Sequence, residues 1–81
     1  MTNEEFDQIV YDTMFSNAAT IRSNMMTALQ WSAYVPGYYD FNWRHEQRVI
    51  DSLERMWVST EIDRFPGDYP GVEVYGLRIN H

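Results

Sequence analysis

The stretch WSAYVPGYYDFNW, residues 31–43, divides the chain into two parts of different character. Residues 1–35 contain no glycine and no proline, whereas all four glycines and all three prolines lie between Pro36 and Gly76. Glycine and proline interrupt helices and mark turns. The composition therefore predicts an α+β fold in a single small domain of residues 1–81, with a helical first part and a turn-rich second part.

The first part carries the signals of an amphipathic helix. Thr2 and Glu5 have the spacing of a capping box, in which each side chain accepts a hydrogen bond from the other residue's backbone N–H. Side chains suited to a buried face then recur three and four residues apart. They are Phe6, Ile9, Val10, Thr13 and Met14. We therefore predict a helix over about residues 3–16 whose stripe faces the core.

A second helix is predicted over about residues 17–33. Ser16 or Asn17 is a suitable N-cap, because a short polar side chain can accept hydrogen bonds from the free N–H groups of a first turn. The face expected to be buried holds Ile21, Met25, Ala28, Leu29 and Ser32. The segment carries one charge, Arg22, which suits an ordinary core helix or a helix covered on two sides in an assembly. A single bent helix over residues 3–33 is the alternative.

A third helix is predicted over about residues 42–57. Asp51 and Arg55 form an acid-first pair four residues apart, an arrangement worth about 0.3 kcal/mol to a helix. One side of the helix is apolar. It holds Trp43, Ile50, Leu53 and Trp57, with Val49 and Met56 widening the stripe. We expect this side to face the core.

The last part predicts a β-hairpin with strands over about residues 58–65 and 72–79, because both segments alternate and Pro-Gly pairs separate them. A lone hairpin is marginal in water, so it must pack on the helices or extend across a dimer. In the second strand the apolar side chains change face between Val74 and Tyr75. That strand is either buried on both faces or carries a bulge near Gly76.

Length and charge exclude several classes of protein. The chain is short and has no cysteine, so its core is small and neither disulfides nor cysteine-bound zinc can support it. A homodimer is one other way to stabilise so small a body. The net charge of −6, with six arginines and no lysine, disfavours direct binding of nucleic acid. An acidic N-terminus and the lack of a long apolar run predict no signal peptide and no membrane span, hence a cytoplasmic protein.

Sequence patterns for catalysis and metal binding are missing, so we predict a protein that is not an enzyme and uses no cofactor or metal. His45 and Glu46 begin like a zinc-protease motif, but Val49 stands where the second histidine is needed. We therefore expect His45 to be a solvated or salt-bridged helix residue. The chain has no cysteine nucleophile and no glycine-rich phosphate loop, and we expect its carboxylates to be solvated or structural.

The aromatic side chains around Pro36 are the most unusual feature of the sequence. Phe41 and Trp43 suit the entry of the third helix and the core, but a turn cannot bury all of its tyrosines at once. Tyrosine, tryptophan and arginine are enriched in protein interfaces. The predicted protein interface consists of Trp31, Tyr34, Tyr38, Tyr39, Asp40, Glu46 and Glu54.

These patterns predict a small acidic protein-binding module that inhibits or regulates a larger protein with a basic surface, such as one that handles nucleic acid. Phage accessory proteins that block host defences, including anti-CRISPR proteins, are an analogous class without a shared motif, and such a protein would work in the host cytoplasm. One alternative is a nucleotide-binding protein in which Arg44 and Arg48, one helical turn apart, contact a phosphate. Another is a structural subunit of a larger assembly.

Overall fold

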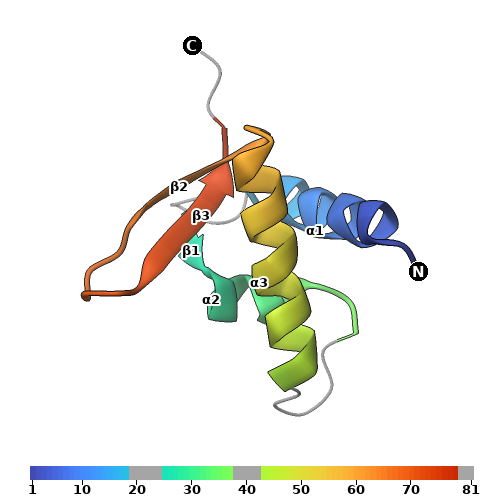
Figure 1. Ribbon diagram of the computed structural model, residues 1–81, viewed down its shortest axis with the longest axis horizontal. Helices are drawn as coiled ribbons and strands as arrows, with labels where there is room; N and C mark the ends of the chain where they lie inside the picture. The colour runs from blue at the N-terminus through green and yellow to red at the C-terminus, as the bar shows by residue number, and fades with distance from the viewer. Residues whose placement is uncertain (19–24, 38–42, 79–81) are drawn as a thin grey trace.

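The computed structural model describes residues 1–18, 25–37 and 43–78, and it has the predicted α+β fold (Figure 1). In chain order the elements are α1 (Asn3–Ala18), β1 (Met26–Thr27), α2 (Ala28–Tyr34), α3 (Trp43–Val58), β2 (Ile62–Pro66) and β3 (Glu73–Leu77). The strands form an antiparallel sheet in the order β1-β3-β2, so β3 is central. None of the helices in these ranges is long and apolar enough to cross a lipid bilayer.

The predicted capping box begins α1. The Thr2 N–H donates to Glu5 Oε1 and the Glu5 N–H donates to Thr2 Oγ1, both at 3.1 Å. Hydrogen bonding of the Glu5 carboxylate to the Thr2 backbone N–H, and to the Thr2 side chain, lowers the pKa of Glu5. The helix ends two residues later than predicted, at Ala18, because Ser16 and Asn17 continue it instead of capping a new one. The Asn17 side chain donates to Thr13 O of the preceding turn at 2.7 Å.

The predicted start of the second helix is wrong, because α2 begins only at Ala28. The alternative of a single bent helix over residues 3–33 is also wrong. Met26 and Thr27 form strand β1, which pairs with β3 and separates α1 from the short helix α2. Thr27 also caps α2 in a capping box with Gln30, so one residue ends the strand and starts the helix. Ser32 is buried as expected, but Leu29 is exposed, while Ile21 lies outside the described residues.

Helix α3 has the predicted extent to within one residue, but its buried face is rotated from the one expected. His45, Val49, Ser52, Leu53 and Met56 are buried. Ile50 is half-buried and Trp57 is 36% exposed, so Trp57 is not a core residue as predicted. The side chain of Trp43, and all of Phe41, lie outside the described residues. The rotation follows from packing, because α1, α2 and β2 all contact α3 and together select its innermost face.

A long-range ion pair replaces the predicted pair of Asp51 and Arg55. Arg55 donates two hydrogen bonds to the Asp7 carboxylate of α1, from Nη2 at 2.6 Å and from Nε at 3.0 Å. Partial burial of Asp7 opposes its ionisation, but the hydrogen bonds and charge of Arg55 outweigh it, so the pKa of Asp7 is lowered. The two-point contact fixes α1 against α3.

The hairpin is shorter than predicted and starts later. Val58 ends α3, and Thr60 then turns the chain with a φ of 65°, so β2 begins only at Ile62. The pairing with β3 runs in regular register from Ile62 opposite Leu77 to Pro66 opposite Glu73, without a bulge among these residues. Residues on both faces of β3 are at least half-buried. Of the two alternatives that the sequence allowed, burial on both faces is therefore correct and a bulge near Gly76 is not.

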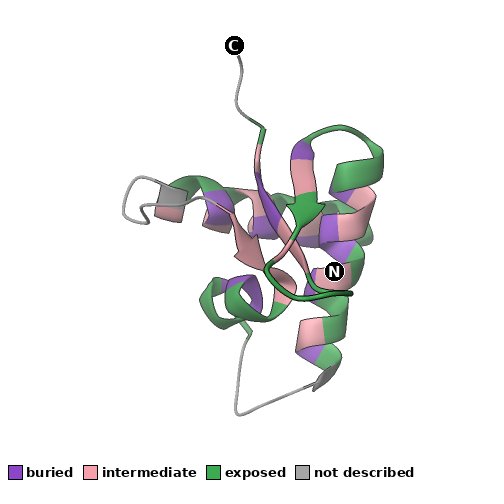
Figure 2. Ribbon diagram, turned by 90° about the vertical axis from the view of Figure 1, so that its left-hand side faces the viewer, coloured by how far each residue is buried: buried purple, intermediate pink, exposed green. Residues whose placement is uncertain are grey.

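One core holds the elements together. Its fully or nearly fully buried side chains are Phe6, Val10, Met14, Trp31, Val35, Val49, Leu53, Met56, Ile62 and Tyr75. Figure 2 shows buried segments on all three helices and on the sheet, next to exposed segments of the same elements. The Trp31 ring is 0% exposed, and its Nε1–H donates to the Tyr75 carbonyl at 2.7 Å. This bond connects α2 to the central strand.

Replacing Trp31 by phenylalanine keeps an aromatic ring but removes the indole donor and part of its volume. We expect Trp31→Phe to lower the free energy of unfolding by about 2 to 3 kcal/mol, because it leaves a cavity and an unpaired buried carbonyl. Urea denaturation followed by circular dichroism measures the change. The matched variant Trp57→Phe, at a partly exposed site, should change stability by less than about 1 kcal/mol; equal effects would contradict the assignment of Trp31 to the core.

Candidate protein-binding groove

A groove of about 410 Å³ runs between α2, α3 and the start of β3. It is lined by Thr27, Ala28, Leu29, Glu46, Ile50, Glu54, Gly71, Val72, Glu73 and Tyr75. The three charged side chains in this set are all acids, and the rest are mainly apolar. A concave apolar surface bordered by charge of one sign is typical of a site that binds a partner of the opposite sign.

Helix α3 provides one wall of the groove. Glu46, Ile50 and Glu54 follow one another at intervals of four residues, so they form a stripe along one side of the helix. The adjacent stripe of α3, which includes Val49 and Leu53, is buried in the core. Anchoring of that stripe fixes the direction in which Glu46 and Glu54 project.

Helix α2 and the turn before β3 provide the opposite wall. The Thr27 capping box sets the first turn of α2 and leaves Leu29 59% exposed. Val72 is 39% exposed and follows Gly71, whose φ of 79° favours glycine at this turn. Leu29 and Val72 therefore present apolar surface that the fold itself does not cover.

An ionic network beside the groove centres on Arg64 of β2, which contacts two of the lining glutamates. Its Nη1 donates to both Glu54 carboxylate oxygens, at 3.1 and 3.2 Å, and its Nε forms a 2.5 Å ion pair with Glu73 Oε2. The guanidinium carbon lies 3.4 Å from the centroid of the Trp57 ring, a cation–π contact. Within the described residues Glu46 has no ion-pair partner. Three carboxylates against one guanidinium leave an excess of negative charge at the groove.

Tyr75 joins this network to the core. Its ring is buried, and its hydroxyl donates to Glu54 Oε1 at 2.5 Å. Burial and the hydrogen bond to Glu54 raise the pKa of Tyr75 to about 12. The hydroxyl therefore stays protonated and, together with Arg64, holds the Glu54 carboxylate in place.

The structure brings together only some of the predicted interface residues. Glu46 and Glu54 line the same groove, whereas Trp31 is fully buried and its ring is not available to a partner in this fold. Tyr34 ends α2 and is 50% exposed, but it does not line the groove. The predicted interface residues Tyr38, Tyr39 and Asp40 lie outside the described residues.

Sequence reasoning missed the apolar wall and one of the acids. Leu29 was assigned to a buried helix face, and neither Val72 nor Glu73 was connected with the acids of the third helix. The spacing of Glu46, Ile50 and Glu54 was a usable signal, because it predicts a mixed acidic and apolar stripe. Nothing local to Leu29 or Val72 indicates that the two lie on the same groove.

The predicted ligand residues Arg44 and Arg48 also lie together, in a separate hollow beside His45. His45 is buried instead of solvated, so its prediction was wrong. Its Nε2 lies 3.2 Å from the Ser32 carbonyl oxygen, which can only accept a hydrogen bond, so this ring nitrogen is the donor. The packing of α2 against α3 encloses the ring.

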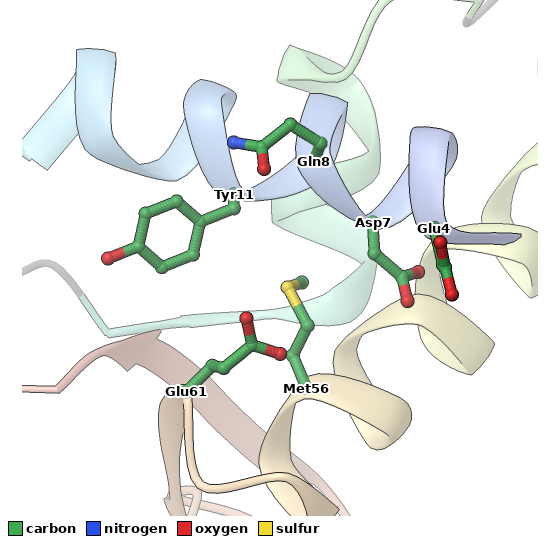
Figure 3. A pocket seen from close by; sticks show the side chains of 6 residues that line it. All are labelled: Glu4, Asp7, Gln8, Tyr11, Met56 and Glu61. Carbon is green, nitrogen blue, oxygen red and sulfur yellow. The ribbon is translucent and has the colours of Figure 1, made fainter.

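A third hollow, of about 330 Å³, lies between α1 and the end of α3. Figure 3 shows Tyr11 and Gln8 from α1 on one side and Met56 and Glu61 on the other, with Asp7 and Glu4 further along α1. Although this hollow is also acidic, Asp7 is already paired with Arg55 and Met56 is almost fully buried. It therefore offers a partner less exposed apolar surface than the groove at Leu29 and Val72.

Among residues 1–18, 25–37 and 43–78, no group of histidine and acidic side chains is arranged to hold a metal ion. Comparison with protein-family models, with characterised proteins and with solved structures finds no match to this chain. The function is therefore argued from the surfaces described above.

The contact between Tyr75 and Glu54 should make stability depend on alkaline pH. In the unfolded chain the tyrosine ionises near pH 10.0, whereas in the fold it keeps its proton up to about pH 12. The unfolded state thus loses a proton first, so stability falls as pH rises through this interval. We expect Tyr75→Phe to be less stable than the wild type at neutral pH, with the difference shrinking above pH 10.0.

Thermal unfolding from about pH 9 upward measures this effect, and the lack of lysine leaves tyrosines as the main side chains that titrate there. The control Tyr69→Phe removes a hydroxyl from a side chain that is 73% exposed. It should keep the wild-type pH profile. A stability difference for Tyr75→Phe that is constant with pH would contradict the raised pKa.

Proposed function

We propose that this protein is a non-enzymatic binding module that inhibits or regulates a larger protein by binding a basic, partly apolar segment of it. The observation that carries the proposal is the groove itself, in which exposed Leu29 and Val72 lie beside Glu46, Glu54 and Glu73. Interface hot spots combine apolar anchors with charges that are partly removed from water.

The three glutamates contribute differently to this binding. Glu54 and Glu73 are held by Arg64, so they supply a fixed negative field in the groove. Glu46 has no ion-pair partner within the described residues and lies half-buried at the rim. We assign to Glu46 the direct contact with an arginine or lysine of the partner, because such a pair is partly shielded from solvent.

The chemistry of the groove favours a partner that is basic. Proteins that handle nucleic acid carry such surfaces, and the net charge of −6 complements them. The small acidic inhibitors of phages, including anti-CRISPR proteins, provide an analogy for this mode of action, and a cytoplasmic location accords with it. The prediction that Tyr34, Tyr38, Tyr39 and Asp40 extend the contact stays a prediction.

The proposal is tested by capture from the native host extract with the immobilised protein, followed by binding measurements on the purified partner. We expect Glu46→Gln and Leu29→Ser each to weaken the captured partner's binding by about tenfold, the usual size of a hot-spot effect. Binding should also weaken as ionic strength rises. Addition of the protein to the partner's activity assay should reduce or alter that activity.

Two matched controls remove the same groups elsewhere on the surface. Asp12→Asn neutralises an exposed acid of α1, and Val58→Ser removes an apolar side chain that is 74% exposed at the end of α3. Both should bind the partner as the wild type does. Binding that is unchanged by the two groove substitutions, or lost equally in the controls, would exclude this groove as the binding site.

A further inference from the structure

A hollow of about 500 Å³ lies between α1, the turn after α2 and the first turns of α3. It is lined by Met1, Phe6, Ile9, Pro36, Gly37, Arg44, His45 and Arg48. None of these residues lines the acidic groove. The volume lies within the range of about 300 to 1,000 Å³ that is typical of small-molecule sites.

The charge of this hollow is opposite to that of the protein. Two of the six arginines line it together with a histidine, and no carboxylate is among its described lining residues. Acids outnumber arginines by twelve to six in the chain, so a random surface hollow would be expected to contain acids. The site is therefore suited to an anion although the molecule as a whole is acidic.

Glu46, which lies between the two arginines in sequence, faces another part of the structure. Glu46 lines the acidic groove, whereas Asp51 lines a smaller neighbouring hollow together with Arg48 and Phe6 and accepts a hydrogen bond from Gln47 Nε2 at 2.9 Å. Among the described residues, no ion pair joins Arg48 to Glu46 or to Asp51.

The hollow also has a fixed aromatic part. The guanidinium carbon of Arg48 lies 4.2 Å from the centroid of the Phe6 ring, a cation–π contact. The His45 ring meets Phe6 edge-on, with centroids 6.4 Å apart, and is anchored by Ser32 O. A guanidinium held over an aromatic ring can donate to a phosphate at its edge and stack with a planar group on its open face.

We propose that this hollow binds a nucleoside monophosphate, with Arg44 and Arg48 contacting the phosphate and the apolar lining contacting the base and sugar. Met1, Ile9 and Pro36 provide that apolar lining. Arginine recognises phosphate by parallel N–H···O bonds, and the one-turn spacing of Arg44 and Arg48 allows both side chains to reach a single phosphate group. The site is independent of the acidic groove and of the proposed protein partner.

Isothermal titration calorimetry with adenosine monophosphate, adenosine and inorganic phosphate tests the proposal. We expect adenosine monophosphate to bind, and adenosine and phosphate to bind at least about tenfold more weakly, because each lacks one half of the recognised group. Arg48→Gln and Arg44→Gln should each weaken the binding of adenosine monophosphate by at least about tenfold. Circular dichroism confirms that each variant is folded, and exposed Arg44 provides the second test if loss of the Arg48–Phe6 contact prevents folding.

The control Arg78→Gln removes an exposed arginine that donates to Thr60 O, away from the hollow. It should bind adenosine monophosphate like the wild type, as should Glu46→Gln, which tests only the acidic groove. The proposal is overturned by any of three results. These are no heat of binding with adenosine monophosphate, equal binding of inorganic phosphate, and an effect of Arg78→Gln as large as that of the two variants in the hollow.

Discussion

The hydrogen bond from the Trp31 indole to the Tyr75 carbonyl is the contact on which the arrangement of the whole molecule depends. It joins residues 44 positions apart, in the helical first part and in the central strand of the sheet. Tyr75 also pairs with Met26 of β1 and Arg64 of β2, and its hydroxyl binds Glu54 of α3. Four elements therefore meet at one residue. Because the indole is fully buried, the bond forms only when the ring is enclosed, so the position of β3 and the packing of the core are set together.

Local sequence signals predicted the helices α1 and α3. They did not predict β1, whose conformation depends on pairing with a strand that is distant in the sequence. The Thr2–Glu5 capping box and the apolar stripe of α1 were both readable, and α3 was placed to within one residue. Strand β1 has only two residues and no pattern of its own, since its conformation is imposed by pairing with β3. The preference of Arg55 for Asp7 over Asp51 has the same origin: a half-buried two-point contact is stronger than an exposed pair within one helix.

The residues of the candidate groove show the same difference between local and long-range signals. Its acids on α3, Glu46 and Glu54, were among the interface residues predicted from the sequence, because the charge of a side chain is a local property. Its apolar wall was not, since Leu29 and Val72 become neighbours of that helix face only through the pairing of β1 with β3. The aromatic residues chosen for their type and for their position around the turn at Pro36 gave a mixed result, with Trp31 in the core and Tyr34 exposed. A tyrosine or tryptophan is expected to be buried either in the protein's own core or against a partner. Only the tertiary structure determines which of the two applies.

The distribution of charge around α3 follows from helix geometry and makes the two proposed sites separable. Successive residues turn by about 100°, so Glu46 is about 200° from both Arg44 and Arg48 around the helix axis. The acid and the arginines thus project from nearly opposite sides, one toward the groove and the others toward the cationic hollow. The core stripe of Val49, Leu53 and Met56 fixes the helix between them and is fully or almost fully buried. An anion in the hollow contacts none of the residues that line the groove, so it can affect partner binding only through its long-range field or by moving α3 against this packed core.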